Sequence, residues 1–450
     1  MIEASASRRI VAMIGVFIIP TMSPTLSPAQ STLKSLPCKR HDMWLSEFEI
    51  VLRDRVIPNG AVRIENGRIA EIREKPVGHA DIEGGGRLLL PGFIDMHGDM
   101  VEREVEPRIG VHVPMRIGIA ELDKKLASCG ITTAYAALSF IGASVTSGVL
   151  RSEDHTTEII GTIAGLKDHL LVDHRIHARF EVTFTPALPT LRKLMDAGRL
   201  HLISLMDHTP GQGQYRDVEL YIARIAKERG MSVAAASEVV GKRMAGREGQ
   251  GDVLNALQDL SARARAAGIV LASHDDDTLE KVELVHGLGA ALSEFPVTLE
   301  AAQEARRLGM HTAMGAPNAL RGESYSGNLS ARQAYEAGLL DMLASDYHPA
   351  SILPAVLGLA ELRGNGLAAA AALTSANPAN ALGLTDRGAI EPGLLADFVV
   401  ADRHPVPRVR ATFRAGRMIY GDGTLAPAGK AERVGPVAAE RLPAAARESA

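Results

Sequence analysis

Apolar runs of strand length alternate with helical patterns through the middle of the chain, from about residue 91 to residue 384. This alternation is typical of βα units built around a parallel sheet. Eight such runs can be counted, which is the strand number of a TIM-type (β/α)8 barrel. The runs are LLLPGFIDMH, ITTAYAALSF, IHARFEVTF, HLISLMDH, IVLASHDD, GAALSEFP, HTAMGAPN and MLASDYHP.

Shorter β-rich runs, separated by Asn-Gly and Gly-rich turns, lie on both sides of this middle part. We therefore expect an α/β fold in which residues 91–384 form the barrel. The two flanks, residues 44–90 and 385–425, should build one small β-sandwich from both ends of the chain. Residues 426–450 contain Ala, Pro and charged residues without periodicity, which predicts a disordered tail.

Residues 1–43 combine an Arg-Arg pair, an apolar stretch and a Ser/Pro-rich segment, which is the layout of a signal peptide. We favour a disordered extension or an upstream start in the gene, because a folded pattern begins only after this segment. No apolar run reaches the roughly 18 residues needed to span a bilayer. The two cysteines, Cys38 and Cys129, imply no disulfide framework, so a cytoplasmic location is expected.

The composition, with 46% hydrophobic and 23% charged residues among 450, is typical of a soluble globular protein with a large core. A net charge of −4 gives no general attraction to nucleic acid or acidic lipid. We therefore expect a small-molecule substrate and neither nucleic acid nor membrane as a partner. The sequence is compatible with a homo-oligomer.

Most of the predicted strands end in polar or ionisable residues, and barrels of this type place their active sites at these strand ends. Residues i and i+2 of a strand face the same side, so His97 and Asp99 can hold one object between them. Each residue alone has an ordinary explanation as a hydrogen-bonded histidine or a solvated carboxylate. Together the strand ends supply three histidines and three carboxylates, namely His97, Asp99, Glu181, His208, His274 and Asp346.

Such a ring of carboxylates and imidazoles would repel itself unless cations lay within it. Mixed ligands of this kind suit zinc, manganese or iron(II) better than magnesium or calcium, and zinc is the first choice. Six ligands suffice for two ions, bridged by Glu181 at the end of the third strand. Two ions about 3.5–4 Å apart would activate a water for hydrolysis. Asp346 is the expected general base as well as a ligand.

Gly-rich and Arg-containing loops on the same predicted rim offer N–H, hydroxyl and guanidinium donors for an anionic substrate. None has the phosphate-binding motif of nucleotide hydrolases, so ordinary polar turns are the alternative. Of the three aspartates after His274, we expect at least two to cap the next helix rather than orient the imidazole. The expected substrate contacts are Arg103, Arg108, Gln212, Arg216, Asn318, Arg321, Ser324, Ser326 and Asn328.

Several long motifs carry a resemblance to a known family: PGFIDMH, LISLMDHTPGQGQ, LASHDDDT, SEFPVTLEAA, MGAPNALRGESYSGN and LASDYHPASIL. They resemble the amidohydrolase superfamily and, within it, the α-D-ribose 1-methylphosphonate 5-triphosphate diphosphatases of the carbon–phosphorus lyase pathway. The resemblance covers about Phe48 to Tyr420. It implies hydrolysis of the 5-triphosphate to pyrophosphate and the 5-phosphate, and it places the family's metal ligands on the six strand-end residues.

Departures from the family pattern include Glu323 and Tyr325, which replace small and imidazole side chains in the Gly/Ser loop. A carboxylate at Glu323 would weaken anion binding unless it points away. Asp99 stands where metal-dependent relatives commonly have a histidine, and it fits the diphosphatase subgroup. The alternatives are an amidohydrolase that cleaves a cyclic amide or deaminates a nucleobase, and a catalytically inactive scaffold relative. All six ligand positions hold competent residues, which argues against the scaffold.

Overall fold

The computed structural model describes residues 42–108, 110–141, 153–215, 217–245, 251–324, 328–362 and 366–425. The predicted N-terminal extension, apart from its last two residues, and the predicted C-terminal tail lie outside the described residues. Within the described ranges, no helix is both long enough and apolar enough to cross a membrane.

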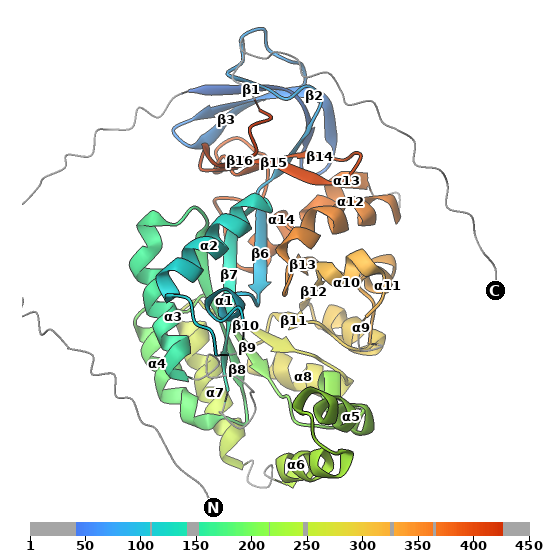
Figure 1. Cartoon of the computed structure of the whole chain (residues 1–450). Helices are drawn as coiled ribbons and strands as arrows, with labels where there is room; N and C mark the ends of the chain where they lie inside the picture. Colours follow the sequence, from blue (N-terminus) through green and yellow to red (C-terminus); the bar gives the residue numbers. More distant parts are fainter. Residues whose placement is uncertain are drawn as a thin grey trace, which may run out of the picture. The chain divides into compact units, whose positions relative to one another are not determined.

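Eight parallel strands form one sheet, in which each strand lies beside its neighbours in sequence (Figure 1). The last strand returns to the first, because Gly98 and Asp346 form a parallel bridge. The backbone N–H of Asp346 donates to the carbonyl of His97 at 2.9 Å. The predicted (β/α)8 barrel is therefore confirmed. Its strands are β6 (Phe93–Gly98), β7 (Ile131–Phe140), β8 (Asp173–Glu181), β9 (Leu202–Met206), β10 (Val270–His274), β11 (Leu292–Glu294), β12 (His311–Gly315) and β13 (Met342–Ala344).

Helices follow every barrel strand, and their ends have local causes. The hydroxyl of Thr278 accepts a hydrogen bond from the N–H of Lys281 and caps α8, which ends at Gly289 in the left-handed conformation. The helices are α1 (Val101–Val105), α2 (Met115–Ser128), α3 (Glu153–Leu166), α4 (Leu188–Asp196), α5 (Val218–Arg229), α6 (Val233–Ala245), α7 (Gly251–Ala266), α8 (Leu279–Leu288), α9 (Leu299–Arg307), α10 (Ala316–Arg321), α11 (Ala331–Glu336), α12 (Ile352–Leu362), α13 (Gly366–Ala372) and α14 (Ala376–Ala381).

A second sheet contains strands from both flanks of the barrel, as predicted, and Figure 1 shows the blue and red strands together. The two flanks meet where β5 pairs antiparallel with β14, with Leu89 opposite Val400. Phe48, Phe398 and Phe413 are buried in the core of this sheet. Its strands are β1 (Met43–Val51), β2 (Val56–Glu65), β3 (Arg68–Arg73), β4 (Ile82–Glu83), β5 (Leu88–Pro91), β14 (Phe398–Asp402), β15 (Arg408–Arg414) and β16 (Arg417–Gly421).

The first predicted run, LLLPGFIDMH, divides between the two sheets at Gly92. Strand β5 ends at Pro91 and β6 begins at Phe93. The N–H of Gly92 donates to the carbonyl of Asp397 at 2.8 Å, and a Cβ at this position would lie 2.5 Å from the Thr132 hydroxyl. A glycine is therefore needed where the chain passes from one sheet to the other.

The carboxyl of Asp397, at this junction, is buried and accepts a hydrogen bond from the N–H of Ala415 at 2.7 Å. Burial raises its pKa to about 6, although the Ala415 hydrogen bond and Arg387 oppose the rise. Folding therefore favours the protonated form. This stabilisation is present below the ordinary pKa near 4 and is lost as the pH rises through 6.

We expect the Asp397→Asn variant to lack this pH dependence. Between pH 4 and pH 7 the free energy of unfolding of the wild type should fall by up to about 3 kcal/mol relative to the variant, since one pKa unit corresponds to about 1.4 kcal/mol. Urea unfolding at several pH values measures the difference. Parallel pH profiles of the free energy of unfolding for the two proteins would show that ionisation of Asp397 does not destabilise the folded state.

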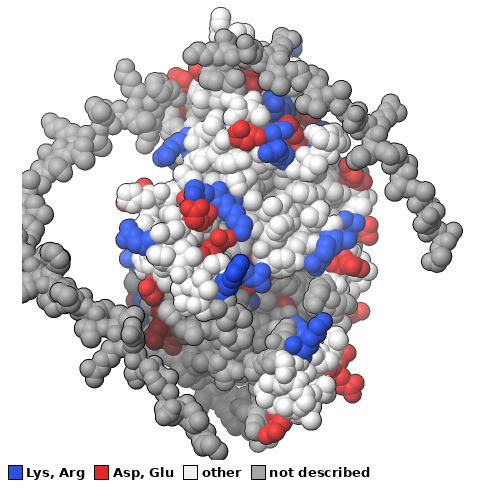
Figure 2. All heavy atoms as spheres, in the orientation of Figure 1, with Lys and Arg blue, Asp and Glu red and all other residues white. Residues whose placement is uncertain are grey.

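Basic and acidic side chains lie interspersed on the face of the molecule drawn in Figure 2. Some of the surface charges are paired, as between Arg53 Nε and Glu391 Oε1 at 2.7 Å. Both side chains of this pair are exposed by more than two fifths, so it should stabilise the fold by no more than about 1 kcal/mol.

Candidate metal centre

All six predicted ligands lie at the carboxyl ends of barrel strands, which share one rim because the strands are parallel. His97 lies in β6, and Asp99 follows this strand. Glu181 and His274 are the last residues of β8 and β10, while His208 and Asp346 follow β9 and β13 by two residues. The assignment of Glu181 to the third barrel strand agrees with the sequence-based count.

Glu181 and His208 are in direct contact. The Oε2 atom of the buried Glu181 lies 2.9 Å from Nδ1 of His208, and both carboxylate oxygens accept from the His208 backbone N–H at 3.2 and 3.3 Å. The Glu181 carboxylate therefore holds both the backbone and the imidazole ring of His208 in position.

The buried His274 ring connects the ligands to one another. Its centroid lies 5.9 Å from that of His208 and 5.6 Å from that of His97. One ligand atom from each of His208, His274 and Asp275 lies within 4.8 Å of the others, and the same holds for His97, His274 and Glu294. Within the described part of the chain, Nε2 of His274 has no hydrogen-bond partner, and Nδ1 lies 3.2 Å from Oδ2 of Asp275 without forming an aligned hydrogen bond. A buried imidazole with one unpartnered nitrogen and a carboxylate beside the other fits a metal ligand.

Asp275, directly after His274, is held ionised by its neighbours. Burial alone would raise its pKa, but His274, His208 and Lys281 outweigh burial and lower the pKa to about 2. Its Oδ2 lies 3.2 Å from Nδ1 of His274. Asp275 and Asp346 both have left-handed backbone, with φ of 54° and 53°. Aspartate tolerates this conformation, which turns the chain directly after the strand end.

Glu294, the last residue of β11, is a buried acidic residue that the sequence analysis did not select. Its Oε1 lies 3.4 Å from Nδ1 of His97, and its Oε2 accepts from the Ser204 hydroxyl. That hydroxyl also lies 2.6 Å from Nε2 of His177. Burial lowers the pKa of His177 to about 3, although Glu294 opposes the shift. Neutral His177, Ser204 and Glu294 thus hold the His97 ring in place.

Asp99 has a cationic partner that the sequence analysis also missed. Its Oδ2 lies 3.2 Å from Nη1 of Arg179, a buried residue of β8. Burial alone would lower the pKa of this guanidinium, but Asp99, Glu102 and Asp346 outweigh burial and raise it. The alternation of His177, Arg179 and Glu181 in IHARFEVTF was the available signal, because residues two apart share one face.

The prediction that at least two aspartates after His274 cap the next helix was wrong, because Thr278 is the cap. Asp276 accepts from the hydroxyls of Ser273 and Ser293, both at 2.5 Å. Asp277 accepts from the N–H of Gly213 at 2.7 Å. The two carboxylates therefore accept hydrogen bonds from β10, β11 and the segment after β9, and not from the first turn of α8.

The predicted substrate contacts are spread over several loops and remain a prediction. Arg103, on α1, and Arg108 are exposed, as is Arg321, whose Nη1 donates to the Tyr347 hydroxyl at 2.9 Å. Gln212, Ser324 and Asn328 are half-buried, whereas Arg216, Tyr325 and Ser326 lie outside the described residues.

Asn318 has a bracing role within α10. Its Oδ1 accepts from the N–H of Ala331 at 3.1 Å, and its Nδ2 donates to the carbonyl of Leu329 at 3.5 Å. These bonds join α10 to the start of α11. The second N–H of Nδ2 and the second lone pair of Oδ1 take no part in these two bonds, so the amide can still contact substrate.

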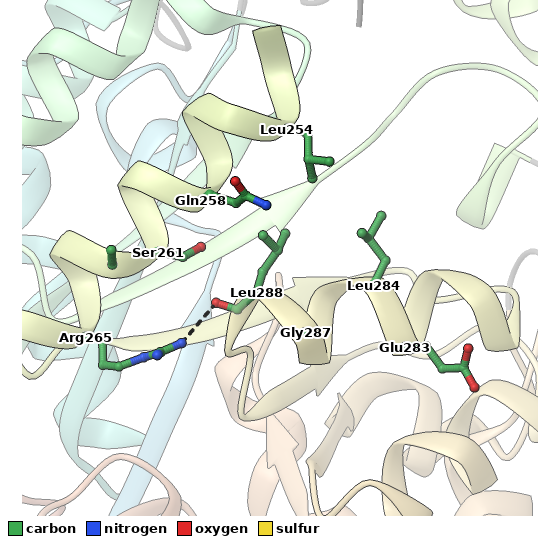
Figure 3. A pocket seen from close by; sticks show the side chains of 9 residues that line it. Leu254, Gln258, Ser261, Arg265, Glu283, Leu284, Gly287 and Leu288 are labelled. Atoms are coloured by element: carbon green, nitrogen blue, oxygen red, sulfur yellow. Dashed lines mark hydrogen bonds between the residues drawn. The ribbon is translucent and has the colours of Figure 1, made fainter. Parts of the chain in front are cut away.

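A groove of about 400 Å³ lies between α7 and α8 (Figure 3). Its lining includes Leu254, Leu284 and Arg265, and Nη2 of Arg265 donates to the carbonyl of Leu288 at 3.5 Å. Both helices lead into the amino ends of barrel strands. The groove therefore contains none of the predicted ligands.

Comparison with known proteins connects this site to a family. A model of the amidohydrolase family matches residues 88–421. The chain is 35% identical over 368 residues to the alpha-D-ribose 1-methylphosphonate 5-triphosphate diphosphatase of Escherichia coli (strain K12), covering 80% of this chain and 95% of that protein.

Two solved structures are similar in fold. N-acetyl-D-glucosamine-6-phosphate deacetylase from Mycobacterium smegmatis has a TM-score of 0.55 at 15% identity, covering 84% of this chain and all of that one. The 5-methylcytosine deaminase from Klebsiella pneumoniae has a TM-score of 0.56 at 14% identity, covering 84% of this chain and 98% of that one. At these identities the likeness shows the fold alone. Together with the family match, it shows that the chain belongs to the amidohydrolase family.

Proposed function

We propose that the protein hydrolyses α-D-ribose 1-methylphosphonate 5-triphosphate to α-D-ribose 1-methylphosphonate 5-phosphate and pyrophosphate, in the cytoplasm, as a step of phosphonate catabolism. Family membership makes it a hydrolase. The phosphoanhydride substrate is supported by the diphosphatase that is 35% identical over most of both chains. The observation that supports metal-assisted chemistry is the buried His274, which lies beside His208 and Asp275 and whose Nε2 has no hydrogen-bond partner among the described residues.

A divalent ion fits the group formed by His208, His274 and Asp275, whose ligand atoms lie within 4.8 Å of one another, with Glu181 in contact with His208. Glu181, His208 and His274 supply the carboxylate and imidazole ligands that suit zinc, with manganese or iron as alternatives. When bound, the ion would polarise the phosphoanhydride and increase the acidity of water. Asp275, held ionised beside both histidines, would balance the charge of the ion.

Asp346 is the proposed general base. Burial raises its pKa despite the opposing charges of His97 and Arg179, which makes the carboxylate a better proton acceptor near neutral pH. Water oxygen forms a new bond to phosphorus as the α–β phosphoanhydride bond breaks. Asp346 takes the proton of the water, and the electron pair of the broken bond leaves with pyrophosphate. Exposed Arg103, Arg108 and Arg321 would bind the outer charges of the substrate.

The proposal is tested by incubating metal-loaded protein with the ribose 5-triphosphate phosphonate and following products by phosphorus NMR. We expect the signal of pyrophosphate with zinc or manganese, and no signal after chelation of the metal. Absence of product with both metals, together with turnover of a cyclic amide or a nucleobase, would move the assignment to another amidohydrolase reaction. Absence of any turnover would favour an inactive scaffold.

A further inference from the structure

Arg179 lies inside the barrel mouth rather than on its outer rim. It precedes Glu181 by two residues on β8, so both side chains point to the same face of the strand. Only 8% of Arg179 is exposed, in contrast to the exposed arginines Arg103 and Arg321. A guanidinium keeps its charge in proteins, so a permanent cation stands beside the predicted metal ligands.

This cation occupies the Asp99 side of the predicted two-ion site. Nη1 of Arg179 lies 3.2 Å from Oδ2 of Asp99. On the same side, Nδ1 of His97 faces Glu294 Oε1 at 3.4 Å. A divalent ion bound to Asp99 would lie within a few ångströms of the guanidinium, and like charges at that distance repel strongly. Asp99 therefore fits a partner of Arg179 better than a ligand of a second ion, and the two candidate ligand groups share His274, which favours one ion over two.

The guanidinium also has unused donor capacity. Its Nε is buried without a hydrogen-bond partner among the described residues, and its Nη1, although 3.2 Å from Asp99 Oδ2, makes no aligned hydrogen bond. Buried donors without partners are costly unless a ligand satisfies them. An arginine with donors free beside a carboxylate ligand set is suited to bind phosphate oxygens.

We propose that Arg179 takes the place of a second metal ion: the site holds one divalent ion, and the Arg179 guanidinium, anchored by Asp99, binds a phosphate oxygen of the substrate. Asp99 is then a positioning residue for Arg179 and not a metal ligand. The phosphate part of this inference rests on the function proposed above, whereas the metal count does not.

The test counts metal and measures pyrophosphate binding, both without turnover. After dialysis against zinc or manganese, elemental analysis should give one ion per chain for the wild type and also for Asp99→Asn. Calorimetry with the metal-loaded protein should show that Arg179→Met weakens pyrophosphate binding by about 10- to 100-fold, the loss expected for a charge-assisted hydrogen bond. The pyrophosphate affinity of Arg179→Lys should lie between those of the wild type and Arg179→Met. Such partial rescue by a second cation would show that the loss in Arg179→Met is not caused by misfolding.

Arg175→Met is the matched control, because Arg175 lies on the same strand at its opposite end and pairs with Asp173 at 3.2 Å. It should keep the metal count and the pyrophosphate affinity of the wild type. Two ions per chain in the wild type, loss of an ion in Asp99→Asn, or unchanged pyrophosphate binding in Arg179→Met would each overturn the inference. A protein that passes these tests but does not hydrolyse the sugar triphosphate would contradict the proposed reaction only.

Discussion

Replacing Asp346 with asparagine is expected to lower kcat by about 10²- to 10⁴-fold, the usual contribution of a positioned general base, while most of the bound metal is retained. The backbone of Asp346 closes the barrel through hydrogen bonds to β6 and its following residue, and its φ is 53°. Asparagine tolerates this left-handed conformation, so the substitution removes the proton acceptor without opening the barrel. Steady-state kinetics and metal analysis on the same preparation measure both effects.

Asp341→Asn provides a matched control at the opposite end of the same strand. Asp341 lies just before β13 and pairs with Arg306 at 3.0 Å, away from the strand-end ligands. We expect this variant to keep the kcat of the wild type. Wild-type kcat in Asp346→Asn would show that another group accepts the proton. Loss of metal from this variant would show that Asp346 acts mainly as a metal ligand.

The His274→Ala variant should lose both the metal and the activity. Among the described residues, His274 belongs to both groups of candidate ligands, so its loss removes a ligand from each of them. We expect metal affinity to fall by more than the 10- to 100-fold that is typical for loss of an outer partner. In the wild type, free metal at 100 times its Kd should raise the free energy of unfolding by about 2.7 kcal/mol, and the variant should lack this gain.

Urea unfolding with and without zinc measures this gain. His286→Ala is the control, because His286 is an exposed histidine near the end of α8. It should show the same stabilisation by zinc as the wild type. If His274→Ala were still stabilised to the wild-type extent, the metal would have to bind elsewhere in the chain.

The barrel could be predicted from sequence because its strands are buried on both faces and so form continuous apolar runs. All ten residues of β7 are buried, and this run contains no charged residue. The strand-end histidines could be predicted for a related reason, since a polar residue that ends an apolar run stands out. The break between β5 and β6 at Gly92 depends on contacts between the two sheets, and the local sequence pattern contains no information about such contacts.

Arg179 and Glu294 were missed because each has an ordinary local explanation. An arginine within a strand reads as a solvent-facing residue, and a glutamate before Phe-Pro reads as the start of a turn. Their partners come from alternate barrel strands, such as Ser204 on β9 and Glu294 on β11. Alternate strands share a layer of side chains in such barrels, so these pairs depend on the stagger of the closed sheet.

The pairing of β5 with β14 has a consequence for the synthesis of the chain. Leu89 leaves the ribosome long before its partner Val400 exists, since more than 300 residues separate them. At about 5–20 residues per second the wait is roughly 15–60 s. Strands β1 to β5 must spend that time with an open edge, which is a template for pairing with other nascent chains. We therefore expect chaperones to matter most for this protein during translation of its barrel.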